Sequence, residues 1–275
     1  MPANPTLSDR HKPAFVDLHA HLVPGVDDGP AGEAQAVAML RQAEAAGTEV
    51  IVVTPHLFSS HNLVADVEAV LARRDEFLAK LALLDFHMKI LPGAEVYFTT
   101  GLSDLLRRHN IRISLNGSAF FILEFPFDFV FPGSRDFIYG LLSDGWVPVV
   151  AHPERNQVIQ RHPEVLYEWV KLGALAQVNG GSFMGDFGGA AQASAFTLLR
   201  ANLVHVVASD AHDDRERPPR LDAVYRRLAP EIGDLAGLLF DEVPRAMVHD
   251  EALPDTGEPR DPRRKVRFFD FLKRK

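Results

Sequence analysis

Histidines and carboxylates recur along this chain at the points where apolar runs end. His19 and His21 stand one residue apart after such a run, and Asp27 and Asp28 follow in a turn rich in proline and glycine. Other runs end in these side chains: His56, Glu95, Glu124, His152, Asp210 and His212. Imidazole and carboxylate donors without sulfur suit manganese, iron or zinc. So many donors exceed the needs of one ion and fit two or three, with a carboxylate such as Glu95 bridging.

Two pairs have a spacing that directs both side chains to one point. Residues two apart on a strand point to the same face, so His19 with His21, and Asp210 with His212, can each present two ligands together. Taken singly, a histidine such as His56 also fits the core, where the backbone would satisfy it. Because such residues recur at the same end of six of the seven predicted strands, we favour a shared site over separate structural roles.

The elements that position these residues alternate regularly. Apolar runs predict strands at 14–21, 50–56, 88–96, 120–125, 147–152, 174–180 and 204–212. Helical segments are predicted at 33–46, 63–84, 103–109, 134–144, 163–172, 189–201 and 221–228. Nearly all-apolar strands that alternate with helices indicate a parallel sheet covered by helices. We expect a closed or nearly closed β/α barrel, in which the active site collects at the carboxyl ends of the strands. A doubly wound sheet remains the alternative.

Composition narrows the function classes. The chain has 275 residues, of which 47% are hydrophobic, and it contains no cysteine. This excludes disulfides, zinc–thiolate sites and a thiol nucleophile. A net charge of -8 argues against a nucleic-acid partner. The polar N-terminus is unlike a secretory signal and no apolar run is long enough to span a membrane, so we expect a cytoplasmic protein.

The last residues have a different character from the rest. Residues 263–275, RRKVRFFDFLKRK, mix basic side chains with Phe268, Phe269, Phe271 and Leu272. One interpretation is a helix that contacts a membrane surface, and the other is a solvated end whose aromatic side chains fold back. We favour the second, because so short a segment anchors weakly. We therefore expect a disordered segment at 1–13, one domain at 14–250 and a basic, aromatic tail at 251–275.

The motifs HAH, VTPH, GAEV, LEF, AHPER and SDAH, in this order, resemble the polymerase-and-histidinol-phosphatase (PHP) superfamily. More narrowly, LVPGVDDGP, GAEVYF, AHPERN, QVNGGSF and SDAH with RPP are similar to the manganese-dependent protein tyrosine phosphatases of bacterial capsule and exopolysaccharide loci (the CpsB/CapC/YwqE-like family). The resemblance runs from about Phe15 to about Val248. It implies a single-domain, distorted (β/α)7 barrel of the PHP type with a trinuclear site. The implied metal ligands are His19, His21, Asp28, His56, Glu95, Glu124, His152, Asp210 and His212.

The resemblance also implies two arginines that act on the substrate phosphate. They match Arg155 in HPERN and Arg217 in ERPP. Planar guanidinium groups suit the bidentate binding of phosphoryl oxygens. From the residues alone, Arg217 could equally pair at the surface with a neighbouring acid: Asp213, Asp214 or Glu216.

The implied activity is removal of phosphate from tyrosines, with the tail of a bacterial tyrosine kinase that regulates capsule or exopolysaccharide synthesis as the substrate. Manganese is the expected metal, with iron or zinc compatible. One alternative is a phosphatase of histidinol phosphate or another small molecule. A second is an amidohydrolase-like enzyme, which commonly needs a carboxylated lysine where this chain has Glu124. A third is a non-catalytic metal-binding regulatory module, against which the full ligand set argues.

Overall fold

The computed structural model describes residues 14–99, 101–109 and 112–263. The segment 1–13 and the aromatic part of the predicted tail, 268–272, lie outside these ranges. Among the described residues, no helix has both the length and the apolar character needed to cross a bilayer.

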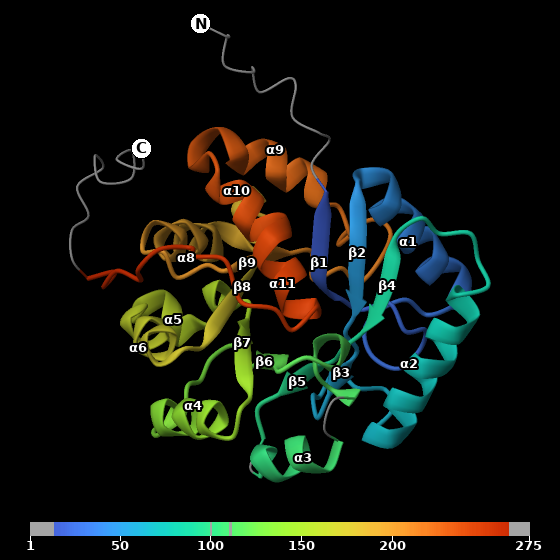
Figure 1. The fold of residues 1–275 in the computed structure, drawn as a ribbon, viewed down its shortest axis with the longest axis horizontal. Helices are drawn as coiled ribbons and strands as arrows, with labels where there is room; N and C mark the ends of the chain where they lie inside the picture. The colour runs from blue at the N-terminus through green and yellow to red at the C-terminus, as the bar shows by residue number, and fades with distance from the viewer. Residues whose placement is uncertain (1–13, 100, 110–111, 264–275) are drawn as a thin grey trace, which may run out of the picture.

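Parallel strands form the centre of the molecule (Figure 1). One sheet has the order β1–β2–β4 and the other has the order β3–β5–β6–β7–β8–β9. Their bounds are β1 (Phe15–Ala20), β2 (Thr48–Val53), β3 (His56–Leu57), β4 (Lys89–Pro92), β5 (Glu95–Tyr97), β6 (Phe120–Glu124), β7 (Val147–Ala151), β8 (Leu175–Asn179) and β9 (Val206–Ala208). All seven predicted strands are confirmed, and two of them are split.

The two split strands break at the same level, which divides the sheet. The strand predicted at 50–56 breaks at residues 54–55 into β2 and β3, and the strand predicted at 88–96 breaks at 93–94 into β4 and β5. Pro55 lacks a backbone N–H and cannot continue a ladder. Gly93 permits close packing, because a Cβ there would lie 2.6 Å from Cγ1 of Val52. Beyond the break the chains pair again, with His56 in register with Glu95.

The first and last strands meet at a short seam. Ala20 and Ala211 form a single parallel bridge. The backbone N–H of His21 donates to the carbonyl of Ala211 (2.8 Å), and that of Asp210 donates to the carbonyl of His19 (2.9 Å). The carboxyl end of β9 therefore lies beside that of β1. The arrangement is a distorted β/α barrel of seven units, in which a bridge rather than a ladder joins the ends.

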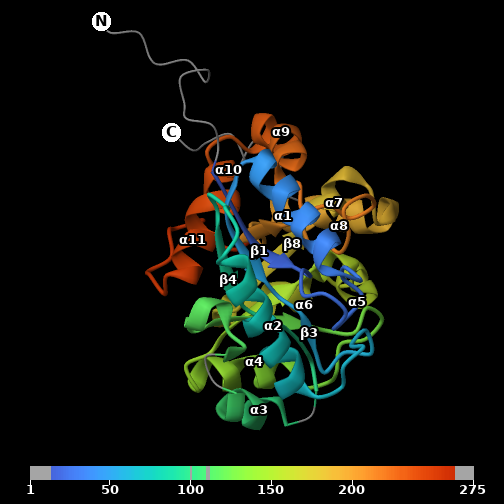
Figure 2. The same ribbon diagram turned by 90° about the vertical axis from the view of Figure 1, so that its right-hand side faces the viewer.

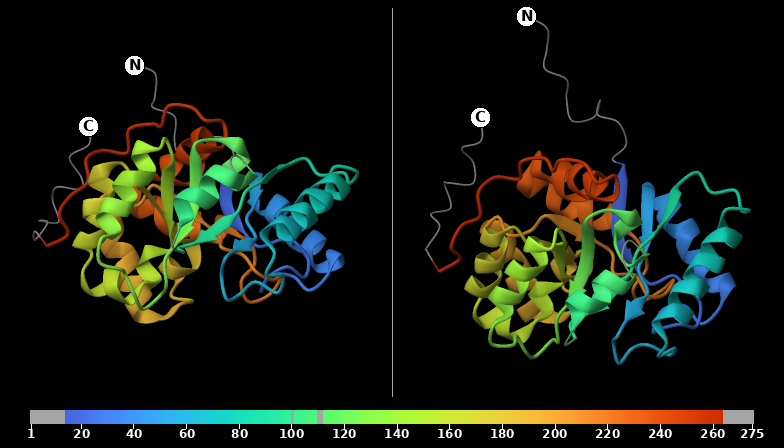
Figure 3. Two further views of the ribbon diagram at one scale, coloured as in Figure 1. Left: turned by 90° about the horizontal axis from the view of Figure 1, so that it is seen from below. Right: turned by 60° about the horizontal axis from the view of Figure 1, so that its bottom comes forward.

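Helices cover the outside of the strands. In Figures 1 and 3, α1 and α2 flank the first sheet, while α4, α5, α6 and α8 flank the second. Figure 2 shows α1 and α2 in front of β1 and β4. The α-helices are α1 (Glu33–Ala46), α2 (Val67–Leu81), α3 (Leu102–His109), α4 (Ser134–Ser143), α5 (Gln157–Arg161), α6 (Glu164–Leu172), α7 (Gly180–Met184), α8 (Gly188–Arg200), α9 (Leu221–Ile232), α10 (Leu235–Gly237) and α11 (Val243–Val248). Shorter or wider turns are η3 (Leu115–Gly117), η4 (Pro153–Arg155) and the π-helical η5 (Leu238–Glu242).

Local signals explain where the predicted helices begin and end. Gly47, at φ 99°, ends α1, and its backbone N–H donates to the carbonyls of Ala43 and Glu44 in the last turn of that helix. The side chain of Asp66 caps α2 by accepting from the N–H of Glu68. The seven predicted helices are confirmed within a few residues. The short α5, α7, α10 and α11 were not predicted, because so few residues carry no readable period.

The inner hydrophobic cluster fills the amino-terminal end of the strands. On β1 it includes Val16 and Leu18, and α11 packs against it. The pairing of β1 with β2 then shifts register between Asp17 and Ala20. After this shift, the side chains that face inward are His19 and His21. One strand therefore contributes apolar residues to the core at its start and polar residues to a site at its end.

Candidate metal centre

The two histidines of β1 are held in one defined orientation. Their Nε2 atoms lie 3.2 Å apart. Nδ1 of His19 lies 2.9 Å from Oε1 of Gln177, and Nδ1 of His21 lies 3.0 Å from Oδ2 of Asp27. Both partners are acceptors, so each Nδ1 donates its hydrogen. In the neutral imidazoles this leaves the Nε2 lone pairs facing the site, which is how metal-binding histidines are oriented.

Glu95 lies at the centre of the predicted ligands. Its Oε2 is 3.3 Å from Nε2 of His19 and of His21, and 2.9 Å from Nδ1 of His56. Its Oε1 is 3.0 Å from Nε2 of His152. Asp210 lies on the other side of the pair, with Oδ1 3.5 Å from both Nε2 atoms. One carboxylate therefore reaches four imidazoles from three strand ends, which suits a bridging ligand.

The structure separates the two adjacent aspartates. Asp27 is buried, and its carboxylate accepts from His21 Nδ1 and from the backbone N–H of His56 and Gly29, each at 3.0 Å. Asp28 instead points toward the imidazoles, with Oδ1 3.4 Å from Nε2 of His56 and of His212. Asp27 thus orients other residues, while Asp28 presents its carboxylate to the cluster.

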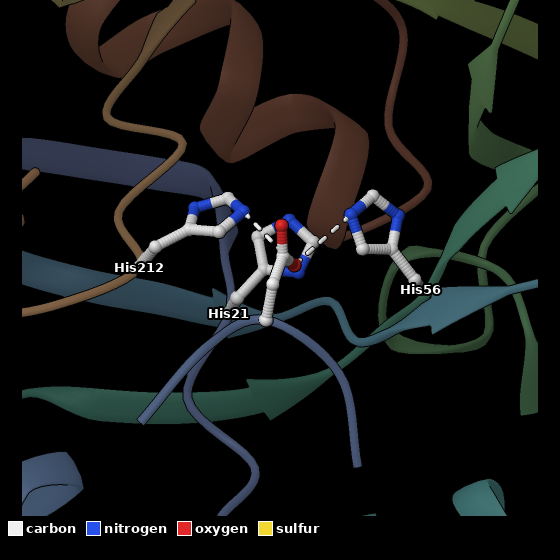
Figure 4. Close-up of side chains that lie close together, drawn as sticks. His21, His56 and His212 are labelled. Atoms are coloured by element: carbon white, nitrogen blue, oxygen red, sulfur yellow. Dashed lines mark ion pairs between the residues drawn. The ribbon is translucent and has the colours of Figure 1, made fainter. Parts of the chain in front are cut away.

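Figure 4 shows His21, His56 and His212 gathered around one carboxylate, with dashed lines for the two ion pairs that Asp28 forms. Three groups of side chains each have donor atoms that lie within 4.8 Å of one another inside the group. The groups are His21, Asp28, His56 and His212; His19, His21 and Glu95; and His56, Glu95 and Glu124. All the residues predicted as ligands therefore lie together at one end of the strands, since His152 and Asp210 contact these groups.

Buried atoms without hydrogen-bond partners test whether a metal ion fits. Within the described residues, His56 Nδ1, Glu95 Oε2 and Glu124 Oε2 are buried and form no hydrogen bond. His56 Nδ1 lies 2.9 Å from the Glu95 oxygen and 3.5 Å from the Glu124 oxygen, but not in hydrogen-bond geometry. Buried polar atoms seldom lack partners. An imidazole nitrogen and two carboxyl oxygens that lie this close together without hydrogen bonds can share a cation, so the donor set fits a divalent metal ion.

The charges of the cluster depend strongly on one another. Burial raises the pKa of Glu124, and the neighbouring Glu95 carboxylate adds to this, to about 9. Burial disfavours the charged form of His56, but the Glu95 carboxylate outweighs it and raises the pKa of this imidazole to about 10. Burial would raise the pKa of Glu95, yet His19 and His56 hold it well below its usual range. The cluster therefore holds protons at neutral pH that a metal ion would displace.

Two of the predicted ligands have an unusual backbone. His152 has φ 30° and Asp210 has φ 51°, both in the left-handed region. Residues other than glycine adopt this backbone conformation at a cost in free energy, and residues in such conformations concentrate at functional sites. The turn at His152 begins η4, which carries Arg155. The strain thus belongs to the two strand ends that supply both ligands and arginines.

Both predicted arginines reach the same carboxylate. Nη1 of Arg155 donates to Oδ2 of Asp210 (3.2 Å), and Nη2 of Arg217 donates to the same atom (2.6 Å) and to the Asp210 carbonyl (2.9 Å). Asp213, considered above as a surface partner for Arg217, instead accepts from the backbone N–H groups of residues 215–217. The guanidinium of Arg217 is therefore turned into the site rather than along the surface.

A polar chain on β8 was missed in the sequence. Nδ1 of His19 donates to Gln177, Nε2 of Gln177 donates to Oδ1 of Asn179 (2.8 Å), and Nδ2 of Asn179 donates to Oδ2 of Asp210 (2.6 Å). Gln177 and Asn179 are fully buried. Their spacing of two residues in QVNGG was the available signal, because it sets both on one face of the strand.

All the predicted ligands and arginines except His19 and His21 line a small cavity of about 110 Å³. Its lining includes Asp28, Glu124, His152, both arginines and two residues not predicted, His61 and Phe127. His61 is nearly half exposed, with Nδ1 3.4 Å from Oδ2 of Asp28. Its ring stacks on that of His56 at 5.3 Å between centroids. The pocket is polar and charged, which suits a small anion held by cations.

Comparison with known proteins agrees with this architecture. Residues 15–248 match the family model described as "Capsular polysaccharide synthesis, CpsB/CapC". The chain is 32% identical over 261 residues to the tyrosine-protein phosphatase YwqE of Bacillus subtilis, covering 94% of this chain and 100% of that protein. It is 30% identical to the putative tyrosine-protein phosphatase CapC of Staphylococcus aureus, covering 77% of this chain and 82% of that protein.

Solved structures agree with this relationship. A crystal structure from work on YwqE of Bacillus subtilis and CpsB of Streptococcus pneumoniae, unique metal-dependent tyrosine phosphatases, matches with a TM-score of 0.80 at 31% identity. The match covers 90% of this chain and 100% of the other. A β-aspartyl dipeptidase of Fervidobacterium islandicum, at 14% identity and a TM-score of 0.51, covers 86% of this chain and 74% of its own and shares the fold alone. From motifs, fold and these matches together, the chain belongs to the CpsB/CapC family of capsular polysaccharide synthesis.

Proposed function

We propose that this protein is a metal-dependent protein tyrosine phosphatase. The observation that carries the proposal is a cluster of unpartnered buried donor atoms on His56, Glu95 and Glu124 beside two arginines that share Asp210. This combines a place for metal ions with cationic donors for an anion, as phosphomonoester hydrolysis requires. The family, and the activity named for its members, support phosphotyrosine as the substrate.

The proposed ligands of two or three divalent ions are His19, His21, Asp28, His56, Glu95, Glu124, His152, Asp210 and His212. Manganese is the proposed metal, and iron and zinc are compatible with the same donors. Such ions, when bound by these residues, would polarise phosphoryl oxygens and lower the pKa of water enough to supply a hydroxide nucleophile at neutral pH. Glu95 would help to hold more than one ion, since its two oxygens face imidazoles from different strands.

The protein's own groups prepare the site for a phosphate. Asp27 and Gln177 keep hydrogen on Nδ1 of His21 and His19, so the opposite nitrogens stay available as ligands. Arg155 and Arg217 line the cavity, and each guanidinium has five N–H donors. The bonds to Asp210 use only part of these, so the remaining donors can bind equatorial phosphoryl oxygens and offset their negative charge.

The proposed physiological substrate is a phosphorylated tyrosine on a bacterial tyrosine kinase that regulates capsule or exopolysaccharide synthesis, met in the cytoplasm. The family description and the activity named for the relatives support phosphotyrosine and the link to capsule synthesis, and the resemblance of the motifs supports the kinase. The negative net charge gives no electrostatic footprint for nucleic acid.

Metal-stripped protein, assayed on a phosphotyrosine peptide with manganese, iron, zinc or nothing added back, tests the proposal. We expect activity only with metal, and most with manganese. Histidinol phosphate assayed in parallel separates the small-molecule alternative. Equal turnover with and without metal would overturn the proposed mechanism, and a preference for histidinol phosphate would overturn the proposed substrate.

A further inference from the structure

Both arginines of the site lie against aromatic rings. The Cζ atom of Arg155 is 4.6 Å from the ring centre of Phe127 and 4.2 Å from that of Phe187. The Cζ atom of Arg217 is 5.5 Å from the ring centre of Phe187. Phe187 therefore contacts both guanidinium groups, while Oδ2 of Asp210 binds both through their N–H groups.

A ring face and a carboxylate restrain a guanidinium in different ways. A carboxylate takes up N–H donors, whereas an aromatic face within about 6 Å attracts the cation through its quadrupole and leaves the N–H groups in the plane free. Two cations at a single oxygen of Asp210 also repel each other, and the negative face of Phe187 offsets part of that repulsion. An aromatic platform is thus suited to fixing two arginines whose donors must remain available to a phosphate.

The chain around Phe187 is built to hold the ring in place. Phe187 lies between α7 and α8, flanked by Gly185 at φ 93° and Gly188 at φ 85°. These are conformations that favour glycine. At Gly181 a Cβ would lie 3.0 Å from Cε2 of the Phe187 ring and 2.9 Å from Oδ2 of Asp186. The absence of a side chain at Gly181 therefore lets the ring approach closely.

The position of the ring argues against a role in the core or in direct substrate contact. Within the described chain, Phe187 is half-buried. It belongs neither to the inner hydrophobic cluster, nor to the larger cluster that includes the buried side chains of α1 and α2, nor to the side chains packed against either. It lines a separate cavity of about 440 Å³ that shares Arg217 with the metal centre. Phe127, in contrast, lines the metal-centre cavity itself. Phe187 therefore contacts the arginines from outside the metal-centre cavity.

We propose that Phe187 is a positioning residue, which holds Arg155 and Arg217 in the orientation that binds a phosphoryl group. The proposal rests on the phosphatase function proposed above. It assigns a role to the segment MGDFGG, 184–189, whose residues are not among the proposed ligands.

The test compares metal-loaded variants in two measurements. Phe187→Leu keeps apolar bulk and removes the aromatic face, and Phe187→Trp keeps an aromatic face. Phe196→Leu is the matched control, because Phe196 on α8 is also half-buried and faces an arginine, Arg227, at 5.7 Å. Calorimetric titration with inorganic phosphate reports binding without turnover, and hydrolysis of a phosphotyrosine peptide gives kcat and KM.

We expect Phe187→Leu to weaken phosphate binding and to lower kcat/KM by about fivefold to thirtyfold, the range for a partly desolvated cation–π contact. Phe187→Trp should restore most of both, and Phe196→Leu should resemble the wild type. Bound metal and melting temperature should be unchanged in Phe187→Leu. In an Arg155→Ala background the same change should cost less, because one of the two cations that the ring restrains is gone.

Three outcomes would overturn the proposal. The first is equal phosphate binding by the wild type and Phe187→Leu. If phosphate binding is equal and only KM for the peptide rises in Phe187→Leu, the ring acts on the tyrosyl group instead of the arginines. The second is equal loss in the leucine and tryptophan variants. The third is a wild type that binds no phosphate. If the wild type binds phosphate but hydrolyses no peptide, the proposed function fails while the binding comparison still decides the role of Phe187.

Discussion

Replacing each of the two adjacent aspartates by asparagine separates a residue that orients ligands from one that presents a carboxylate. Asp27 accepts three hydrogen bonds at 3.0 Å, from His21 Nδ1 and the N–H groups of His56 and Gly29. An asparagine at this position offers one oxygen and an amide NH₂ group. Whichever way that amide is turned, at least one donor then faces N–H and has no acceptor: the partly buried N–H of Gly29 in one orientation, or the buried donors of His21 and His56 in the other.

The expected magnitude follows from that count. A buried donor left unsatisfied costs about 1–3 kcal/mol, so Asp27→Asn should destabilise the metal-free protein by an amount in this range, near its lower end if only the partly buried Gly29 N–H loses its acceptor. Loss of the carboxylate that orients His21 should also weaken metal binding by about tenfold to a hundredfold. Asp28 is partly exposed and contacts imidazoles, so Asp28→Asn should change the metal-free stability by less than about 1 kcal/mol. Its metal affinity should fall further than that of Asp27→Asn.

Urea unfolding of the metal-free variants and titration with manganese measure the two quantities separately. The wild type and an Asp136→Asn variant, which makes the same change at an exposed position of α4, serve as references. A metal-free Asp27→Asn protein as stable as the wild type, or an Asp28→Asn protein that keeps full metal affinity, would refute the roles assigned to these residues.

Three further predictions follow from other contacts. Arg217→Lys should lower kcat/KM by about tenfold to a hundredfold with bound metal unchanged, because an ammonium cannot reproduce the fork that donates to Asp210; unchanged turnover would remove it from the site. Gln177→Met keeps volume but breaks the bond to His19, so manganese affinity should fall about tenfold, and equal affinity in a titration would contradict this. Burial lowers the pKa of His205 to about 4, below its ordinary 6.5, so the unfolded chain binds the extra proton. The contribution of neutral His205 to the free energy of unfolding is therefore fully present above pH 6.5. As the pH falls toward 4, about 3 kcal/mol of that free energy is lost. The free energy of unfolding of His205→Gln, measured in urea at several pH values, should not show this part of the loss. If the wild type and His205→Gln lose the same free energy as the pH falls, the assignment to His205 is contradicted.

Much of the fold could be read from local pattern, because local physics decides it. The apolar runs that became β1 and β6 to β9 need burial on both faces, and Gly47 ends α1 by its left-handed conformation. The breaks between β2 and β3 and between β4 and β5 were not predicted. Pro55 marks the first break, whereas Gly93 is explained only by Val52 on the neighbouring strand, a contact that no local window contains.

The candidate site divides in the same way. The histidines and carboxylates at the strand ends were found because parallel strands bring their carboxyl ends to one edge. Gln177 and Asn179 were passed over, since amides carry no distinctive chemistry until they are seen bonded to His19 and Asp210. Phe187 had no readable signal, because its contacts come from two other loops.

The sequence by itself determined the alternation of elements, the absence of thiol chemistry and the set of residues that face one end of the strands. These follow from composition and from the period of the side chains. Only the tertiary structure decided that Asp27 braces the loop while Asp28 faces the imidazoles, and that Arg217 turns to Asp210 rather than to the acids beside it in the chain. The physical reason is that side-chain direction and hydrogen-bond satisfaction depend on neighbours from distant strands, which a linear pattern does not contain.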